Sequence, residues 1–343
     1  MSPRPPVAKQ AGDAARRFCV LTLDGGGARG YLTLKLLEHA ESCLDTSTGT
    51  RVPLGERFDL VCGTSTGGII ALALALGHPV REVSALYETH LPRIFGPAMR
   101  RMSWVDVFRP RYRADALREA MQAFFGDLTL ADVRTDVCVT ATSLVNARPQ
   151  LFRSDYLERW APDSDTRIAD LALATSAAPT FFAAHSTEHL SDLVDGGLYA
   201  NNPALLGVAE AFRFGRPSRR GVAPPHDLGA SCLDRLAVLS LGSGEQCAMP
   251  YDPARLRTGG WLAWGAHFHS VASESQSQYV DLLAEGLLGA SYHRINPRLD
   301  FPMPMDDVPR LPSLKNLAVL SARDEAFLRE RIGARAEHAD AAG

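Results

Sequence analysis

The sequence predicts an α/β protein with a mainly parallel central sheet and helices on both faces, and three observations favour this class. Short apolar segments with strand character alternate with segments of helical pattern along most of the chain. Two of these apolar segments lead into glycine-rich turns, at 24–30 and 63–67, and each turn is followed by a helical pattern. With 343 residues, of which 46% are hydrophobic, the chain is long enough to bury one large core.

The expected elements follow one another along residues 18–333, which we interpret as one domain. Residues 1–17 and 334–343 are expected to form a disordered N-terminal tail and a fraying C-terminal tail. The strand signals are, in chain order, Phe18–Leu23, Asp59–Cys62, Asp136–Thr140, Leu193–Val194 and Leu236–Ser240. Helical patterns are expected at Tyr31–Leu44, Ile69–Leu76 and Val208–Phe214, a polar turn-rich segment at Ser42–Thr50, and a mobile surface loop at Gly215–Gly229.

The turn at 63–67 reads Gly-Thr-Ser-Thr-Gly and is the strongest candidate for a nucleophile in the chain. It lies between a strand signal and a strongly apolar helical pattern. Gly63 and Gly67 permit the strained backbone of a tight strand-to-helix turn, which presents the side chain of Ser65 at the start of the helix. Free N–H groups at that helix end favour an anion. The pattern predicts a nucleophile elbow with Ser65 as the nucleophile.

A second glycine-rich turn, Asp24–Gly30, contains three consecutive glycines that let backbone N–H groups converge on an oxyanion or a phosphate. The same residues fit the dinucleotide fingerprint Gly-x-Gly-x-x-Gly, which needs an acidic residue about 20 positions further on, at the end of a second strand. Asp45 has that spacing, but it lies in a polar turn-rich segment. A lone fingerprint of this kind is weak evidence, and we favour the anion-binding interpretation.

The third motif is Asp195-Gly196-Gly197, which follows the strand signal at 193–194. Taken alone, it indicates a turn in which the carboxylate caps its own backbone. Beside the other two motifs, Asp195 becomes a candidate catalytic base.

Together and in this order, the three motifs resemble those of the patatin-like phospholipase family. The matches are Asp24–Gly30, Gly63–Gly67 and Asp195–Gly197, with no departure in any of them. The segments Ser176–Thr180 and Tyr292–Pro297 are also similar to the stretch before the Asp-Gly-Gly motif and to the closing strand of that family. The resemblance covers roughly Phe18 to Leu320 and implies a three-layer patatin-like fold for the whole domain 18–333.

The resemblance implies a Ser–Asp dyad, with Ser65 as the nucleophile and Asp195 as the general base. It also implies an oxyanion hole formed around three glycines and an arginine, namely Gly25, Gly26, Gly27 and Arg29. Arg29 is expected to hold the loop or a lipid phosphate. An aspartate is ordinarily a weak base, with a pKa near 3.9, and burial in a dry site would raise that pKa and help it accept a proton.

A Ser–Asp–His triad is the alternative, because histidines follow Asp195 in the chain order that such triads use. The candidates are His267, His269 and His293. We favour the dyad on the family resemblance and expect each histidine to be structural or exposed.

Two segments resemble caps over a lipid site. Pro92–Arg118 interleaves arginines with apolar residues, Trp104 and Phe108 among them, a composition that suits anionic head groups. It is equally compatible with a segment packed on the core with solvated arginines. Gly259–Leu288 is expected to line an acyl pocket or receive a regulator, or else to be a core helix with a polar outer face.

The formal net charge of −3 gives no reason to expect binding of a nucleic-acid polymer. The six cysteines have no metal-ligand spacing, and we expect them to be reduced. No calcium loop or His-x-x-x-His pair is present, so neither a metal nor another cofactor is expected. No export signal, spanning segment or lipidation motif is visible, which favours a cytoplasmic protein that contacts the inner face of the cell membrane peripherally.

The expected function is a lipid acyl hydrolase that cleaves membrane phospholipids through an acyl-enzyme on Ser65. A single-domain chain of this size also resembles the phospholipase effectors of antiphage defence systems, which implies a cyclic dinucleotide as activator. The alternatives are a constitutive acyltransferase or thioesterase and a non-catalytic binding module of the same shape. Positional preference on the lipid and the formation of a homodimer are left open by the sequence.

Overall fold

A seven-stranded sheet forms the centre of the computed structural model, which describes residues 17–96, 110–157, 163–226, 232–247, 251–265 and 267–333. The expected tails, apart from Arg17, lie outside the described residues. The strands are β1 Phe18–Leu23, β2 Leu60–Gly63, β3 Asp136–Ser143, β4 Arg148–Arg153, β5 Leu193–Asp195, β6 Leu236–Leu241 and β8 Tyr292–Ile295. A separate parallel pair consists of β7 Glu245–Gln246 and β9 Arg298–Leu299.

The strand order β4-β3-β2-β1-β6-β8 is mainly parallel, as the sequence predicts. The pairs β2–β3, β1–β2, β1–β6 and β6–β8 are parallel, whereas β4 and β5 both run antiparallel to β3. All five strand signals are confirmed, with ends that differ by at most three residues. The hairpin strand β4 was not expected, because its residues Arg148, Pro149 and Gln150 are polar or lack an N–H group and show no apolar strand pattern.

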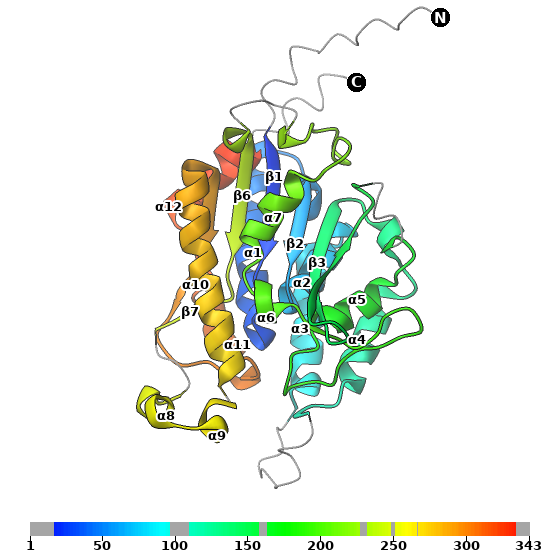
Figure 1. Cartoon of the computed structure of the whole chain (residues 1–343). Helices are drawn as coiled ribbons and strands as arrows, with labels where there is room; N and C mark the ends of the chain where they lie inside the picture. The colour runs from blue at the N-terminus through cyan, green and yellow to red at the C-terminus, as the bar shows by residue number, and fades with distance from the viewer. Residues whose placement is uncertain are drawn as a thin grey trace, which may run out of the picture.

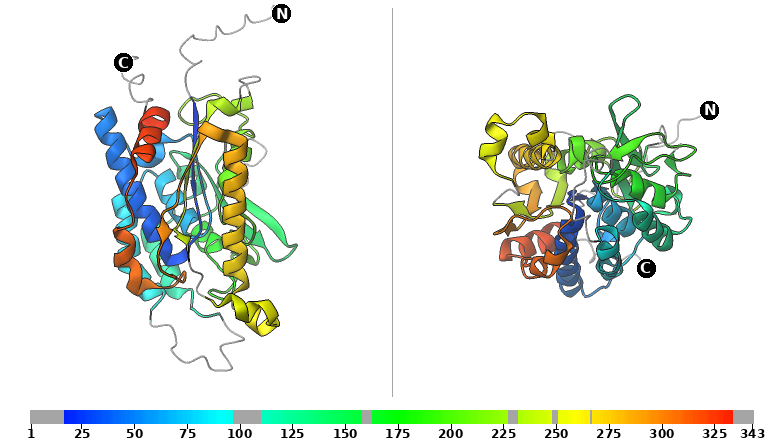
Figure 2. Two further views of the ribbon diagram at one scale, coloured as in Figure 1. Left: turned by 90° about the vertical axis from the view of Figure 1, so that its left-hand side faces the viewer. Right: turned by 90° about the horizontal axis from the view of Figure 1, so that it is seen from below.

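The helices cover both faces of the sheet, so the fold has three layers (Figures 1 and 2). Seen edge-on in Figure 2, the sheet lies between α1 and α12 on one side and α10 on the other. The helices before β5 are α1 Gly30–Thr48, α2 Thr66–Ala75, α3 Val80–Ile94, α4 Asp115–Phe125 and α5 Ile168–Thr175. Those after β5 are α6 Gly197–Ala200, α7 Ala204–Ala211, α8 Pro253–Thr258, α9 Trp261–Gly265, α10 Phe268–Leu288, α11 Leu311–Lys315 and α12 Ala322–Phe327.

The central strand β1 shows why the layers form. Successive side chains of a strand point to opposite faces, and every residue of β1 is buried. Leu21 and Leu23 pack into the cluster formed with α1 and α2, whereas Phe18 and Val20 pack into the cluster formed with α7 and α10. A strand that is apolar on both faces therefore needs a helical layer on each side.

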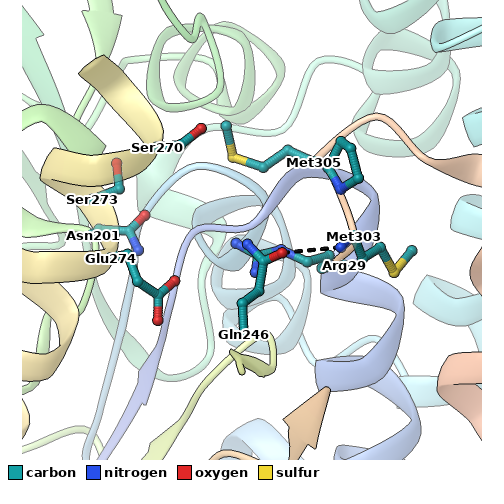
Figure 3. Close-up of a pocket in the computed structure, with 9 residues that line it drawn as sticks. Arg29, Asn201, Gln246, Ser270, Ser273, Glu274, Met303 and Met305 are labelled. Atoms are coloured by element: carbon teal, nitrogen blue, oxygen red, sulfur yellow. Dashed lines mark hydrogen bonds between the residues drawn. The ribbon is translucent and has the colours of Figure 1, made fainter. Parts of the chain in front are cut away.

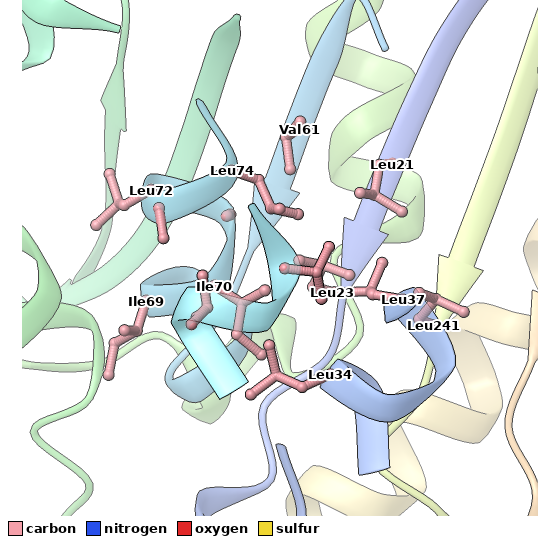
Figure 4. Close-up of a cluster of buried hydrophobic side chains, with 14 of the residues drawn as sticks. Leu21, Leu23, Leu34, Leu37, Val61, Ile69, Ile70, Leu72, Leu74 and Leu241 are labelled. Carbon is pink, nitrogen blue, oxygen red and sulfur yellow. The ribbon is translucent and has the colours of Figure 1, made fainter. Parts of the chain in front are cut away.

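Helix α2, which follows the Ser65 turn, is buried along its whole length (Figure 4). Its side chains, among them Ile69, Ile70, Leu72 and Leu74, pack against β1, β2 and α1. An all-apolar helix of this kind is stable only inside the protein. Its N-terminus is consequently held rigidly behind the Ser65 turn.

Three element boundaries differ from those expected. Helix α1 continues through the predicted turn-rich segment to Thr48, because its end is set by Gly49, whose left-handed backbone (φ 67°) lets its N–H donate to the carbonyl of Asp45. Helix α2 starts three residues before its apolar run, and α7 spans 204–211 instead of 208–214. The described part of the expected surface loop, 215–226, is held at the start of β3 by ion pairs from two arginines to buried Asp136.

Candidate active site

Ser65 lies in a sharp turn between the end of β2 and the start of α2. Its backbone has φ 56° and ψ −127°, a region that non-glycine residues rarely adopt. The flanking glycines are required by close backbone contacts. A Cβ on Gly63 would lie 2.2 Å from the carbonyl oxygen of Gly67, and a Cβ on Gly67 would lie 2.3 Å from that of Leu23. The N–H of Ser65 donates to Thr175 Oγ1 at 2.9 Å, which holds the turn in place.

The register of β3 brings Asp195 to Ser65. β4 occupies one edge of β3, so β2 and β5 must share the other edge. On that edge, Val139 pairs with Gly63 at the end of β2, and Ala141 pairs with Asp195 at the end of β5. Because β5 runs antiparallel, its last residue arrives where the chain leaves β2. Two motifs 130 positions apart therefore meet just beyond the end of one strand.

The side chains of Ser65 and Asp195 line the same cavity, and both residues are buried. Burial raises the pKa of Asp195 to about 6, although the nearby Ser65 hydroxyl and the N–H of Gly197 favour the ionised form. The Gly197 N–H donates to Asp195 Oδ1 at 2.7 Å, so the local capping turn expected from this motif alone is also present. Gly196 packs on β3, where a Cβ would lie 2.1 Å from Thr140 Oγ1.

The glycine loop after β1 presents two free backbone donors to the same cavity. Gly25 does not contribute one, because its N–H donates to the carbonyl of Asn201 at 3.0 Å. Among the described residues, no acceptor is found for the N–H groups of Gly26 and Gly27, and both residues line the cavity beside Ser65. Gly27 needs its glycine, since it has φ 60° and a Cβ would lie 2.3 Å from the carbonyl oxygen of Met305.

A buried ion pair anchors this loop at its start. Asp24 is 3% exposed and pairs with Arg294 of β8 at 2.7 Å, while Ser277 of α10 donates a further hydrogen bond to Asp24 at 3.2 Å. Burial raises the pKa of Asp24 and the nearby Arg294 guanidinium opposes that rise. The acidic residue of the glycine-rich motif therefore ties β1, β8 and α10 together beneath the loop.

The cavity at Ser65 encloses about 350 Å³, part of it open to solvent. One side is apolar and is formed by Phe95, Ala178, Phe181 and Phe182. The opposite side carries the polar groups of Ser65, Asp195 and the glycine loop, together with Asn201, His269 and Met305. The arrangement offers a nucleophile, a base, two N–H donors and an apolar wall, which suits acyl transfer from an apolar acyl group.

Arg29 does not line this cavity. It lies on the wall of a second, polar cavity of about 340 Å³, to which Asn201 and Met305 also belong (Figure 3). The expected grouping of Arg29 with the three glycines is therefore divided between two neighbouring cavities. The N–H groups of Gly26 and Gly27 lie beside Ser65, and the buried guanidinium of Arg29 lines the second cavity.

The histidines considered for a triad have different surroundings. His293 hydrogen-bonds Asp324 at 2.7 Å and stacks on Phe327, so it is structural. His267 precedes α10, and its ring lies 5.1 Å from that of Tyr251. His269 does line the Ser65 cavity; burial lowers its pKa, and its Nδ1 has no partner among the described residues. No histidine of the described chain hydrogen-bonds Ser65 or Asp195.

The dinucleotide alternative fails on geometry. Asp45 lies inside α1 and pairs with Arg57, and the second strand β2 ends at Gly63 without an acidic residue. Residues Asn201 and Met305 were missed as cavity residues. For Asn201 the available signal was its position four residues after Gly197 of the Asp195 motif, whereas Met305 enters the site only through tertiary packing.

The two segments expected to cap the site, Pro92–Arg118 and Gly259–Leu288, are described by the structure to different extents. The middle of Pro92–Arg118, including Trp104 and Phe108, lies outside the described residues. In the other segment, the alternative of a core helix with a polar outer face is met only in part, because the exposed face is mixed. Helix α10 turns Ser273 and Ser277 inward, toward Gly197 and Asn201, and exposes apolar side chains, among them Phe268, Tyr279, Leu282 and Leu287.

In the described part of the chain, no helix combines the length and apolar character that crossing a bilayer requires. Those same residues hold no group of three or more histidine, cysteine, aspartate and glutamate side chains that suits a metal ion.

Comparison with known proteins agrees with this geometry. The model of the patatin-like phospholipase family matches residues 21–207. A cGAMP-activated phospholipase of Vibrio cholerae is 36% identical over 62% of this chain and 61% of its own length, and one of Pseudomonas aeruginosa is 31% identical over 82% and 78%. A cUMP-AMP-activated phospholipase of Escherichia coli is 35% identical over 56% and 58%. The chain thus spans less than two thirds of the Vibrio cholerae and Escherichia coli relatives. The motifs, the three-layer fold and the match over more than half of its length show that this chain belongs to the patatin-like phospholipase family.

Proposed function

We propose that this protein is a phospholipid acyl hydrolase that works through a dyad of Ser65 and Asp195. The observation that carries the proposal is that these two buried side chains line one cavity, together with Gly26 and Gly27, whose N–H groups have no acceptor among the described residues. A serine hydroxyl is a weak nucleophile until a base removes its proton. The raised pKa of Asp195, about 6, makes it a better base than an exposed carboxylate while leaving it ionised near neutral pH.

The proposed reaction has two halves. Ser65 Oγ attacks the ester carbonyl as Asp195 takes its proton, and the N–H groups of Gly26 and Gly27 stabilise the oxyanion. The intermediate collapses when the alkoxide of the lysophospholipid leaves and takes the proton from Asp195. Water then attacks the acyl-enzyme and gives a proton to Asp195, and the fatty acid leaves as Ser65 recovers its proton. The acyl chain lies along the wall of Phe95, Phe181 and Phe182.

A cyclic dinucleotide is the proposed activator, since similar proteins are named as phospholipases activated by cGAMP or by cUMP-AMP. In this proposal the enzyme works from the cytoplasm, in antiphage defence, and contacts the membrane peripherally while it degrades phospholipid. A homodimer would be compatible with the exposed apolar face of α10, which the monomer leaves uncovered.

Fatty-acid release from phospholipid vesicles tests the function and its control together. We expect release by the wild type to rise strongly with one cyclic dinucleotide from a panel that includes cGAMP and cUMP-AMP. Ser65→Ala should lower the rate by about 10⁴- to 10⁶-fold under every condition, because the covalent step is lost. Full activity without any nucleotide would instead identify a constitutive hydrolase.

The same assay separates the alternative functions by their products. Free fatty acid indicates hydrolysis, whereas a new ester on an added alcohol indicates an acyltransferase, and cleavage of acyl thioesters alone indicates a thioesterase. If Ser65→Ala keeps the protein's biological effect, the fold is acting as a binding module and the proposal fails.

The oxyanion donors can be tested through the loop that carries them. A Cβ at Gly26 would lie 2.2 Å from Ser243 Oγ, so Gly26→Ala must displace the loop. A displacement of about 1 Å costs on the order of 10²-fold in rate, and we expect a loss of at least this size in fatty-acid release. Gly286→Ala on α10 is the matched control, because a Cβ there meets nothing within 4 Å. Wild-type activity in Gly26→Ala would place the oxyanion elsewhere.

A further inference from the structure

The polar cavity beside the Ser65 cavity has features that the dyad does not use. It is lined by Arg29 of the glycine-rich turn, Gln246 of β7, and Ser270, Ser273 and Glu274 of α10 (Figure 3). Asn201 and Met305 belong to both cavities, so the two sites adjoin each other. A substrate bound at Ser65 therefore has this polar space directly next to its reacting ester.

Arg29 is a buried cation with few partners. It is 6% exposed, and its one hydrogen bond among the described residues runs from NH1 to the carbonyl of Gly244 at 3.3 Å. Its Nε has no acceptor in the described chain. Buried guanidinium groups ordinarily satisfy most of their donors, and a free planar fork of this kind suits a phosphate.

Glu274 places an anion on the same cavity without closing an ion pair. Figure 3 shows it reaching in from α10, whereas Arg29 enters from the glycine-rich turn on the other side. The two attract each other at a distance, but no contact within 4.0 Å joins them among the described residues. One Glu274 oxygen, Oε1, accepts a hydrogen bond from Gln278 at 3.3 Å. The pocket thus holds a positive and a negative group separated by open space.

We propose that this cavity is a head-group subsite that selects a zwitterionic phospholipid, with the phosphate against Arg29 and the ammonium of the head group against Glu274. Gln246, Ser270 and Ser273 supply neutral hydrogen-bonding groups around it. The inference rests on the proposed function and adds the substrate class to it. A head group with an ethanolamine ammonium satisfies both charges, whereas a glycerol head group leaves the Glu274 carboxylate without a partner.

The placement of the two cavities agrees with a phospholipid spanning them. The ester lies at Ser65, the acyl chain follows the phenylalanine wall, and the glycerophosphate passes Asn201 and Met305 to reach Arg29. A cyclic dinucleotide also carries phosphodiesters, but it has no ammonium for Glu274.

The test compares phosphatidylethanolamine with phosphatidylglycerol of identical acyl chains, in mixed micelles and with the activating nucleotide where one is required. We expect the wild type to prefer phosphatidylethanolamine in kcat/KM. Glu274→Gln should lower that preference by at least about fivefold, because a charged hydrogen bond is replaced by a neutral one. Glu274→Lys should reverse it in favour of the anionic lipid. Glu285→Gln, an exposed residue of the same helix, is the matched control and should keep the wild-type ratio.

A wild type without head-group preference, or a preference that survives in both Glu274 variants, overturns the subsite and leaves the phospholipase intact. If no lipid is cleaved, the proposed function fails, and the subsite is judged by calorimetric binding of sn-glycero-3-phosphoethanolamine to the Ser65→Ala protein. Binding that is lost in the added Glu274→Lys change supports the subsite, and absence of binding overturns it. Displacement of this ligand by cGAMP at equal concentration would assign the cavity to the nucleotide and likewise overturn the proposal.

Discussion

Replacing Asp195 by asparagine should remove nearly all fatty-acid release and at the same time make the protein more stable at neutral pH. Loss of a general base costs about 10²- to 10⁴-fold in rate. The gain in stability follows from burial, which raises the pKa of Asp195 from its ordinary value of 3.8 to about 6. A carboxylate that is harder to ionise in the folded state than in the unfolded state destabilises the fold whenever it is ionised.

The pH dependence has a definite sign. Below about pH 4, Asp195 is protonated in both states and contributes no penalty. Between about pH 4 and pH 6 the unfolded state loses its proton first, so the wild type loses stability as the pH rises. Above pH 6 the penalty is complete and amounts to about 3 kcal/mol from a shift of about two units. Asp195→Asn should escape this loss, and its free energy of unfolding should exceed that of the wild type mainly above pH 6.

Urea unfolding at pH 4.5 and pH 7.5 measures the stability effect, and kcat/KM against pH measures the catalytic one. We expect the acidic limb of the wild-type rate profile near pH 6, because Asp195 must be ionised to accept the Ser65 proton. Asp192→Asn is the matched control, since Asp192 is exposed and lies just before β5, three residues before Asp195. An active Asp195→Asn variant would assign the base to another group of the cavity, with His269 the first candidate.

The second large effect is expected at the ion pair beneath the glycine loop. Arg294→Met should lower the free energy of unfolding by about 3–5 kcal/mol at neutral pH, because it leaves Asp24 buried without its cation. The loss should shrink as the pH falls. Burial already raises the pKa of Asp24, removal of Arg294 raises it further, and a protonated Asp24 no longer carries an unpaired charge.

The double variant Asp24→Asn with Arg294→Met separates the pair from the packing around it. Removing both charges should cost less than removing the arginine alone, since no unpaired ion remains. Arg298→Met, an exposed arginine four residues further along, should stay within about 0.5 kcal/mol of the wild type. Equal losses in the single and the double variant would show that Arg294 acts through packing and not through Asp24.

Local motifs were readable from the sequence because their causes are local. The Ser65 turn needs Gly63 and Gly67 for contacts that arise within five residues and the neighbouring strand. The buried strands carry continuous apolar runs, and that pattern predicts a sheet covered on both faces. The end of α1 was misjudged for the converse reason: polar residues at 42–48 look like a turn, but they form the last turns of a helix that packing has already stabilised.

Helix α10 shows what a one-dimensional pattern hides. A polar outer face was one interpretation of its serines and leucines, whereas the structure buries Ser273 and Ser277 against the site and exposes Leu282, Leu283 and Leu287. Hydropathy indicates which residues avoid water on average. It does not indicate that Asn201, beside the Ser65 cavity, donates a hydrogen bond to a serine of a helix 76 residues later in the chain.

The sequence by itself therefore determined the fold class, the sharp strand-to-helix turn at Ser65, the glycine loop and the order of the motifs, because each depends on backbone constraints among neighbouring residues. Tertiary structure alone decided which groups face one another. The register of β3 brings Asp195 to Ser65, the carbonyl of Asn201 occupies the N–H of Gly25, and Arg29 lies in a cavity of its own with Glu274. These relations join residues tens to hundreds of positions apart, and they are set by strand pairing and burial that no local pattern contains.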